Sequence, residues 1–209
     1  MTTLLLAERI EKRYGTHVVL RAERIAVDSG DIVIVSGPNG GGKSTLLRVL
    51  CGVALPSAGR LERSQELDAL RLVYVPQAGG LYQNMTVTEN YLLWSRLYGR
   101  PASGKTVLAR PLAELGLEPF LRLRVAELSG GYRKLAALAC ALAMQPHGIF
   151  LDEPLSGLDE NKAQQVLQNL QRTHSGHGFL IVASHAEADL PFASKVIRVI
   201  GGTATCMEL

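Results

Sequence analysis

The sequence lacks a long hydrophobic run. Its longest uninterrupted apolar stretch, residues 135–144, is ten residues long, whereas a membrane-spanning helix needs about 18 or more. The amino-terminal residues 1–9 also lack the basic lead and the long apolar region of a secretory signal. We therefore expect that the chain does not cross a membrane by itself and that it stays in the cytoplasm.

The sequence also has no strong excess of one charge and little cysteine. Its formal net charge is +3 over 209 residues, which is too mild and too evenly spread to favour nucleic acid as the main partner. A weakly anionic partner or a membrane surface stays compatible with this balance. The three cysteines are scattered without metal-ligand spacing, so we expect reduced, mostly buried thiols. A chain of this length suits one α/β domain with a small subdomain.

Short β-branched segments alternate with helical patterns along most of the chain, which is typical of a largely parallel sheet covered by helices. Residues 4–72 predict a β-rich layer around a first strand–loop–helix unit. The β-branched strands then vanish, and a helical insertion is predicted at about 78–130. The expected helices are residues 87–98, 107–117, 134–144 and 159–173, and the expected strands are residues 17–20, 24–27, 32–35, 148–151, 179–184 and 195–200.

A glycine-rich segment lies between the strand at residues 32–35 and an apolar-periodic helix. Its glycines let the backbone aim N–H groups at phosphates, and the helix N-terminus adds partial positive charge. Lys43 is expected to reach the β- and γ-phosphates, and the Ser44 hydroxyl to coordinate Mg²⁺. Nucleotide binding is therefore the first hypothesis. The segment reads Gly37, Pro38, Asn39, Gly40, Gly41, Gly42, Lys43, Ser44, Thr45.

A second apolar strand ends abruptly in two acids, Asp152 and Glu153. In phosphate-loop NTPases an acid at such a strand end holds Mg²⁺, directly or through water, and Asp152 has that position. Successive strand residues point to opposite faces, so Glu153 can instead face the γ-phosphate and polarise an attacking water. A solvated turn, favoured by Pro154, is the alternative interpretation of these two acids.

A third segment, residues 128–133, precedes the helix expected at residues 134–144. Ser129 suits a helix cap, and Gly130 and Gly131 leave amide hydrogens open at a helix N-terminus. This is a second candidate anion site, so the chain carries two phosphate-binding helix ends.

These motifs, in the order in which they occur along the chain, resemble those of the nucleotide-binding subunits of ATP-binding cassette (ABC) transporters. The resemblance covers nearly the whole chain. The resemblance implies an α/β fold: a P-loop NTPase core of largely parallel sheet, with an N-terminal antiparallel β layer and an inserted α-helical subdomain, in one domain spanning residues 1–209. The matching motifs are Tyr14 as the adenine-stacking aromatic, residues 37–45 as the first nucleotide motif, Gln77 as the Q-loop, residues 128–132 as the signature, residues 149–153 as the second nucleotide motif, residues 156–159 as the D-loop and His185 as the switch histidine.

The resemblance implies an ATP hydrolase that uses ATP and Mg²⁺. Two such domains pair head to tail, and each ATP lies between the loop of one chain and Ser129, Gly130 and Gly131 of the other. Asp159 is implied to lie at this interface. The residues with implied catalytic roles are Lys43, Gln77, Glu153 and His185, and those implied to hold Mg²⁺ are Ser44, Gln77 and Asp152.

The resemblance also implies partners. The chain contains no membrane pathway, so we predict a separate membrane-spanning transporter subunit, contacted through the helical subdomain on the cytoplasmic face of the membrane. A second ABC ATPase subunit is predicted, as a homodimer or a heterodimer, and no nucleic acid. Residues 80–90 and 97–99 look like stretches of bacterial exporter subunits, which favours export. Thr88 is predicted to cap a helix that starts at Glu89, and Tyr132 stands where the family usually has glutamine.

Other classes of function fit the sequence less well. A soluble cassette ATPase of translation or DNA repair usually carries two cassettes or long heptad arms, and this sequence has neither. A kinase or other phosphoryl transferase does not explain residues 128–132 or His185. The sequence argues against a nucleotide-binding but inactive subunit, because it keeps Lys43, Asp152, Glu153 and His185 intact. Nothing in the sequence indicates the transported substrate.

Overall fold

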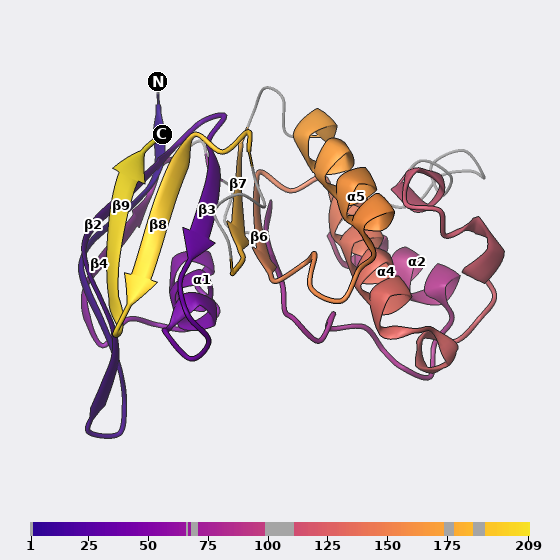
Figure 1. Ribbon diagram of the computed structural model, residues 1–209, viewed down its shortest axis with the longest axis horizontal. Coiled ribbons are helices and arrows are strands. Elements are labelled where there is room, and N and C mark those ends of the chain that lie inside the picture. Colours follow the sequence, from indigo (N-terminus) through magenta and orange to yellow (C-terminus); the bar gives the residue numbers. More distant parts are fainter. Residues whose placement is uncertain (1, 66, 68–70, 99–110, 174–177, 186–190) are drawn as a thin grey trace. The chain divides into compact units, whose positions relative to one another are not determined.

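The computed structural model describes residues 2–65, 67, 71–98, 111–173, 178–185 and 191–209 (Figure 1). The chain divides into two compact units, the first formed by Met1–Tyr74, His147–Glu153 and His174–Leu209, and the second by Val75–Pro146 and Pro154–Thr173. The second unit is larger than the predicted insertion at about 78–130. Among the described helices, none combines the length and the apolar character that crossing a bilayer requires.

The first unit is built on one sheet, whose nine described strands follow the order β4-β1-β2-β9-β8-β3-β7-β6-β5. The strands β8, β3, β7 and β6 run parallel, whereas β4, β1 and β2 pair antiparallel. A short parallel pairing joins β2 to β9 at Arg21 and Ala22. The bounds are β1 Thr3–Tyr14, β2 His17–Asp28, β3 Ile32–Ser36, β4 Ala58–Arg63, β5 Leu72–Val75, β6 Gly148–Asp152, β7 Phe179–Ala183, β8 Lys195–Ile200 and β9 Thr203–Glu208.

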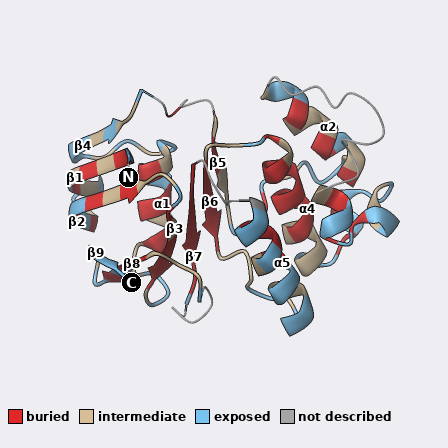
Figure 2. Ribbon diagram, turned by 90° about the horizontal axis from the view of Figure 1, so that it is seen from above, coloured by how far each residue is buried: buried red, intermediate tan, exposed pale blue. Residues whose placement is uncertain are grey.

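The central strands β6 and β7 are buried along their whole length, and β3 along most of it (Figure 2). Parallel strands covered on both faces read as continuous apolar runs, and these three do. Because they are parallel, their carboxyl ends meet at one edge of the sheet. The loop 37–42, Glu153 and His185 follow these ends, so the topology gathers residues that are far apart in the sequence.

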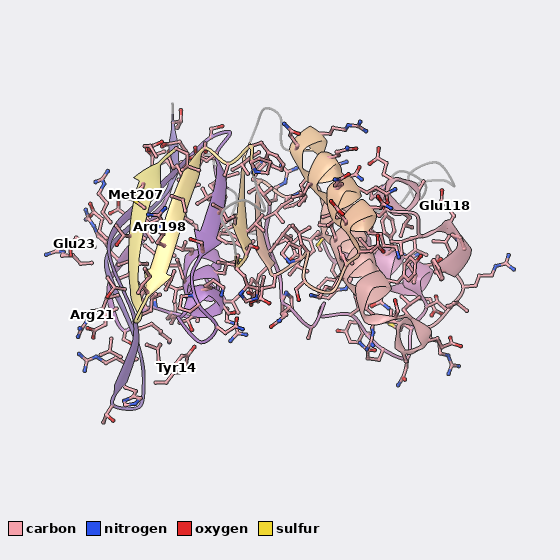
Figure 3. All side chains as sticks on the ribbon, viewed as in Figure 1. Tyr14, Arg21, Glu23, Glu118, Arg198 and Met207 are labelled. Atoms are coloured by element: carbon pink, nitrogen blue, oxygen red, sulfur yellow. The ribbon has the colours of Figure 1, made fainter. Side chains whose placement is uncertain are left out.

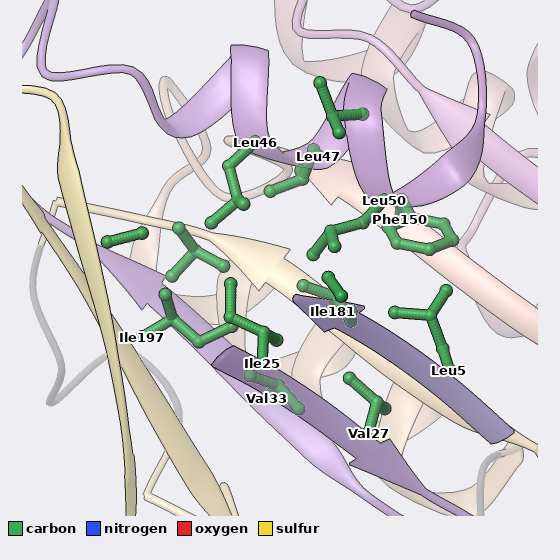
Figure 4. Packing of buried hydrophobic residues seen from close by; sticks show 14 of the residues in the cluster. Leu5, Ile25, Val27, Val33, Leu46, Leu47, Leu50, Phe150, Ile181 and Ile197 are labelled. Atoms are coloured by element: carbon green, nitrogen blue, oxygen red, sulfur yellow. The ribbon is translucent and has the colours of Figure 1, made fainter. Parts of the chain in front are cut away.

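Helix α1, Lys43–Cys51, contacts β1 and β2 as well as β6 and β7. Figure 4 shows Leu46, Leu47 and Leu50 of this helix in one buried cluster with residues of both strand groups. The helix ends at Gly52, whose φ of 85° gives a left-handed C-cap. Burial of its apolar face anchors α1, and with it the loop that leads into its first turn.

The second unit contains every named helix of the described residues except α1. Its members are α2 Val87–Leu97, the 3₁₀ turns η2 Glu118–Phe120 and η3 Val125–Glu127, α4 Gly130–Ala143 and α5 Glu160–Thr173. Thr86 caps α2: its hydroxyl accepts from the Glu89 amide at 3.1 Å, and the Glu89 carboxylate accepts from the Thr86 amide at 2.7 Å. This is a capping box. The prediction that Thr88 caps the helix is wrong, because the Thr88 hydroxyl donates to the Leu121 carbonyl at 2.9 Å.

Several element boundaries differ from the predictions. The segments expected at residues 17–20 and 24–27 are parts of one strand, β2. Helix α4 starts at Gly130, four residues earlier than predicted, because Ser129 caps it directly. Of the helix expected at residues 107–117, residues 107–110 lie outside the described residues, and residues 111–114 are helical. The strands β1, β4, β5 and β9 were not predicted individually.

Candidate functional site

The loop between β3 and α1 has a backbone that glycine alone fits well at two positions. Gly37 has a φ of 147° and Gly42 a φ of 109°, a region that other residues rarely adopt. A Cβ atom at Gly37 would lie 2.2 Å from the backbone oxygen of Val199 in β8. The loop is therefore packed closely against β8, and its amides precede α1, where the helix dipole favours an anion. Thr45 lies in the first turn of α1.

Lys43, the first residue of α1, is buried, with 5% of its side chain exposed. Its Nζ atom donates to the carbonyl oxygens of Gly37 at 2.8 Å and Pro38 at 3.2 Å. The same atom lies 3.9 Å from Oε1 of Glu153. The loop thus folds around its own lysine, and the ammonium group lies beside a carboxylate from β6's carboxyl end.

Ser44 and Asp152 meet at the start of α1. The Ser44 hydroxyl donates to Oδ1 of Asp152 at 3.0 Å, and Asp152 is 4% exposed. Hydroxyl and carboxylate oxygens are ligands that Mg²⁺ prefers. These two side chains, on adjacent elements beside a phosphate-binding loop, therefore fit a Mg²⁺ ion.

The other oxygen of the same carboxylate has a partner that the sequence did not reveal. The Tyr74 hydroxyl, from β5, donates to Oδ2 of Asp152 at 2.9 Å and accepts from Nε of Arg48 at 3.2 Å. Burial raises the pKa of Tyr74 to about 12, so its proton stays on the oxygen at neutral pH. The one signal in the sequence is a tyrosine inside a short apolar strand, since a buried tyrosine hydroxyl usually finds a partner.

Glu153 leaves the strand abruptly. Its φ is 52°, an uncommon value for a residue that carries a side chain, while its amide still donates to the Ala183 carbonyl at 3.1 Å. The side chain is 12% exposed, and Oε1 lies 3.1 Å from Nε2 of His185. The structure thus brings Lys43, Glu153 and His185 together, three of the four residues with predicted catalytic roles.

Tyr14, labelled in Figure 3, ends β1 and is half exposed. The Nζ atom of Lys12 lies 5.1 Å from the centre of its ring and donates to the Leu55 carbonyl at 2.8 Å. An exposed ring backed by a fixed cation is suited to stacking with a planar base.

The signature residues belong to the second unit. The Ser129 hydroxyl accepts from the Tyr132 amide at 3.4 Å, so Gly130 and Gly131 form the first turn of α4. A Cβ atom at Gly131 would lie 3.1 Å from Leu158, which places the D-loop directly against this helix start. The ammonium group of Lys134 also donates to the Ser156 carbonyl at 2.7 Å.

Tyr132 and Asp159 meet through Lys162. The Lys162 ammonium lies 4.1 Å from the centre of the Tyr132 ring and 3.3 Å from Oδ2 of Asp159. The Lys162 amide donates to Oδ1 of Asp159 at 3.0 Å, and this bond lowers the pKa of Asp159. Phe120 contacts the same tyrosine ring, with 4.2 Å between ring centres. The signature and the D-loop are therefore one packed cluster. Gln77, also in the second unit, is exposed and follows β5 by two residues.

Comparison with known proteins agrees with these motifs. The family model described as ABC transporter matches residues 20–156. Nod factor export ATP-binding protein I of Burkholderia orbicola (strain AU 1054) is 34% identical over 184 residues, which make up 84% of this chain and 60% of that protein. Sulfate/thiosulfate import ATP-binding protein CysA of Caulobacter vibrioides (strain ATCC 19089 / CIP 103742 / CB 15) is 32% identical over 206 residues, 92% of this chain and 61% of that protein. The chain thus spans about 60% of the length of these curated relatives.

Solved structures show the same fold. The dimeric structure of MJ0796, a bacterial ABC transporter cassette, superposes with a TM-score of 0.88 at 24% identity, over 99% of each chain. The predicted α/β fold of the P-loop NTPase class is confirmed by this likeness, as is the resemblance noted from the motifs.

Proposed function

Because the chain belongs to the ABC transporter family, we propose that it is the ATP-binding and ATP-hydrolysing component of a transporter. The observation that carries this proposal is the meeting of Lys43, Asp152 and Glu153 at the start of α1, with His185 3.1 Å from Glu153. A phosphate-binding loop, a pair of Mg²⁺-compatible oxygens and a carboxylate paired with histidine occupy one edge of one sheet.

The loop holds the nucleotide. Its amides and the dipole of α1 bind the phosphates, and Lys43 exchanges its carbonyl acceptors for phosphate oxygens. Ser44 and Asp152 would hold Mg²⁺, with Gln77 as a further ligand from the Q-loop. When bound, Mg²⁺ supplies neutralisation of the charge on the β- and γ-phosphates. Tyr14 stacks on the adenine.

Hydrolysis depends on Glu153 and His185. The Glu153 carboxylate takes a proton from the attacking water, and His185, which hydrogen-bonds the γ-phosphate, positions that water together with Glu153. The uncommon backbone conformation at Glu153 aims its side chain at Lys43, beside the phosphate loop. A residue continuing the strand would point to the opposite face from Asp152.

A second cassette completes the site. In the family that the motifs resemble, the two anion-binding helix ends of one chain, at residues 37–45 and at Ser129 to Gly131, serve different nucleotides. Two chains paired head to tail let each ATP contact both, and Asp159 lies along their interface. ATP then favours the closed pair, and hydrolysis releases the pair because closure depends on the γ-phosphate. The pair is a homodimer or a heterodimer with another cassette.

The remaining partner is a membrane-spanning subunit contacted through the helical subdomain, which places the chain on the cytoplasmic face of the membrane. We propose export, on the exporter-like residues 80–90 and on the similarity to the Nod factor export protein. The similarity to the sulfate/thiosulfate import protein is nearly as high, so the direction of transport requires its own experiment. Uptake or efflux of candidate substrates by vesicles that contain the complex would determine it.

The first experiment is a pull-down of the chain from detergent-solubilised native membranes, with ATP turnover measured on the recovered material. Recovery of a membrane protein with several spans, together with turnover that Glu153→Gln abolishes, is the expected result. Recovery of soluble partners alone, with turnover intact in the purified chain, would instead support a soluble cassette ATPase of the translation or DNA-repair type.

A further inference from the structure

We propose that Tyr74 is a positioning residue for Asp152: its hydroxyl fixes one carboxylate oxygen so that the other is presented beside Ser44. The inference rests on the proposed ATP- and Mg²⁺-dependent function and adds a residue that the motifs do not include. Among the described residues, the hydrogen-bond partners of the Tyr74 hydroxyl are Asp152 and Arg48, so the hydroxyl acts through the Asp152 carboxylate.

Hydrogen bonds to both carboxylate oxygens of Asp152 define the orientation of this side chain. Oδ1 accepts from Ser44 at 3.0 Å and Oδ2 accepts from Tyr74 at 2.9 Å. A carboxylate that is 4% exposed can obtain few donors from water, and buried polar atoms in proteins are nearly always hydrogen-bonded. Tyr74 therefore satisfies the oxygen that faces away from Ser44 and prevents the carboxylate from rotating about its χ2 bond.

Arg48 fixes the direction of the tyrosine proton. A phenol has one proton to donate, and its oxygen can also accept. Nε of Arg48 donates to the Tyr74 oxygen at 3.2 Å, so the phenolic proton is left for Asp152. Arg48 and Ser44 lie on the same helix, α1, and the bonds form a closed ring from α1 through β5 and β6 back to α1.

Tyr74 and Asp152 both lie close to points where the chain leaves the first unit. Tyr74 is the last residue of the first unit before the chain passes to the second at Val75, and Asp152 precedes the next such passage after Glu153. The bond between them ties together two segments at which the chain leaves the first unit. Tyr74 lies three residues before Gln77, so a displacement of β5 would reach the Asp152 carboxylate directly.

The test is to measure Mn²⁺ binding to the full chain in the presence of a non-hydrolysable ATP analogue, by electron paramagnetic resonance. Tyr74→Phe removes only the hydroxyl. We expect its dissociation constant for Mn²⁺ to rise about tenfold, the lower end of what loss of a ligand-orienting group costs. Binding of the analogue without metal should stay unchanged, and in turnover assays the half-saturating Mg²⁺ concentration should rise more than kcat falls.

Two further variants make the result specific. Tyr91→Phe removes a hydroxyl from another buried tyrosine, in α2 of the second unit, and should bind Mn²⁺ as the wild type does. Arg48→Met leaves Tyr74 and Asp152 in place but frees the phenol, so it should raise the Mn²⁺ dissociation constant less than Tyr74→Phe. This variant keeps the test available if Tyr74→Phe folds poorly.

The outcomes separate the inference from the proposed function. Wild-type Mn²⁺ affinity in Tyr74→Phe would overturn the inference, and so would an equal loss of Mn²⁺ binding and of metal-free analogue binding, because the effect would then be generally structural. Failure of the wild-type chain to bind the analogue at all would overturn the proposed function itself.

Discussion

Replacing Glu153 with glutamine removes one charge and almost no volume. In the structure this carboxylate lies 3.9 Å from the Lys43 ammonium and 3.1 Å from Nε2 of His185, with 12% of the side chain exposed. If Glu153 accepts the proton of the attacking water, the amide cannot replace it. Turnover should then fall by about 10²- to 10⁴-fold, the contribution typical of a positioned general base.

Nucleotide binding should change in the opposite direction. At 3.9 Å and an effective dielectric constant of about 20, the attraction between Lys43 and Glu153 is about 4 kcal/mol. Phosphate oxygens must compete with that attraction for Lys43, and they are also repelled by the carboxylate. Glutamine removes both effects, so ATP should bind at least as tightly to the variant as to the wild type.

The two quantities need two assays. Phosphate release gives turnover, and titration with a fluorescent ATP analogue gives affinity; size-exclusion chromatography with ATP and Mg²⁺ should show a trapped dimer of the variant. Glu118→Gln, an exposed glutamate of η2, is the matched control and should behave as the wild type. The reasoning is refuted by a Glu153→Gln variant that keeps turnover within tenfold of wild type, or that loses nucleotide affinity. A variant that binds ATP without forming a dimer would refute the two-chain site.

Other substitutions test stability and the loop. Lys195→Met should lower the free energy of unfolding by about 3–5 kcal/mol, because Lys195 is 4% exposed and lies 2.7 Å from Asp28. The hydrogen bond from Lys195 lowers the pKa of Asp28 below its ordinary 3.8, so this stabilisation is present above that pH and is lost as the pH falls through the lowered pKa; urea titrations should show the difference shrinking in acid. Thr86→Ala should cost about 1 kcal/mol in thermal unfolding, because it removes the cap of α2. Gly37→Ala should abolish nucleotide binding in fluorescence titration, because its Cβ would lie 2.2 Å from a backbone oxygen of β8.

Each of these results has a counterpart that would contradict it. Lys162→Met removes an ion pair with Asp159 that solvent screens, so it should cost much less stability than Lys195→Met. An equal loss in both lysine variants would mean that burial is not the cause. Wild-type thermal stability of Thr86→Ala would contradict the capping assignment. Tight nucleotide binding by Gly37→Ala would show that the loop tolerates a side chain.

The local parts of the site could be predicted from the sequence because adjacent residues specify them. Lys43 and Ser44 follow the glycines of their own loop, and Ser129 caps the helix that it precedes. Their geometry needs no knowledge of distant segments. Asp152 was also predictable, because a buried apolar strand that ends in an acid at this position has a recognised role beside such a loop.

The missing parts depend on pairings between distant segments. Tyr74 and Asp152 are 78 residues apart in sequence, and only the placement of β5 beside β6 brings them together. Glu153 was expected to face away from Asp152 by strand alternation, but the strand ends at Asp152 and a turn of the backbone sets its direction instead. The contact of Tyr132 with Lys162 likewise joins two helices, so no local pattern reveals it.

The backbone conformation of Glu153 lowers the stability of the fold while it positions a carboxylate needed for ATP turnover. A φ of 52° is energetically more favourable for glycine or asparagine than for glutamate. The left-handed conformation costs other residues roughly 1–2 kcal/mol. A library of variants selected for thermal stability alone should therefore enrich glycine and asparagine at this position, while selection for ATP turnover should restore glutamate. Glu153 therefore lowers the stability of the fold slightly, and this loss accompanies a backbone conformation that keeps its carboxylate beside the phosphate loop.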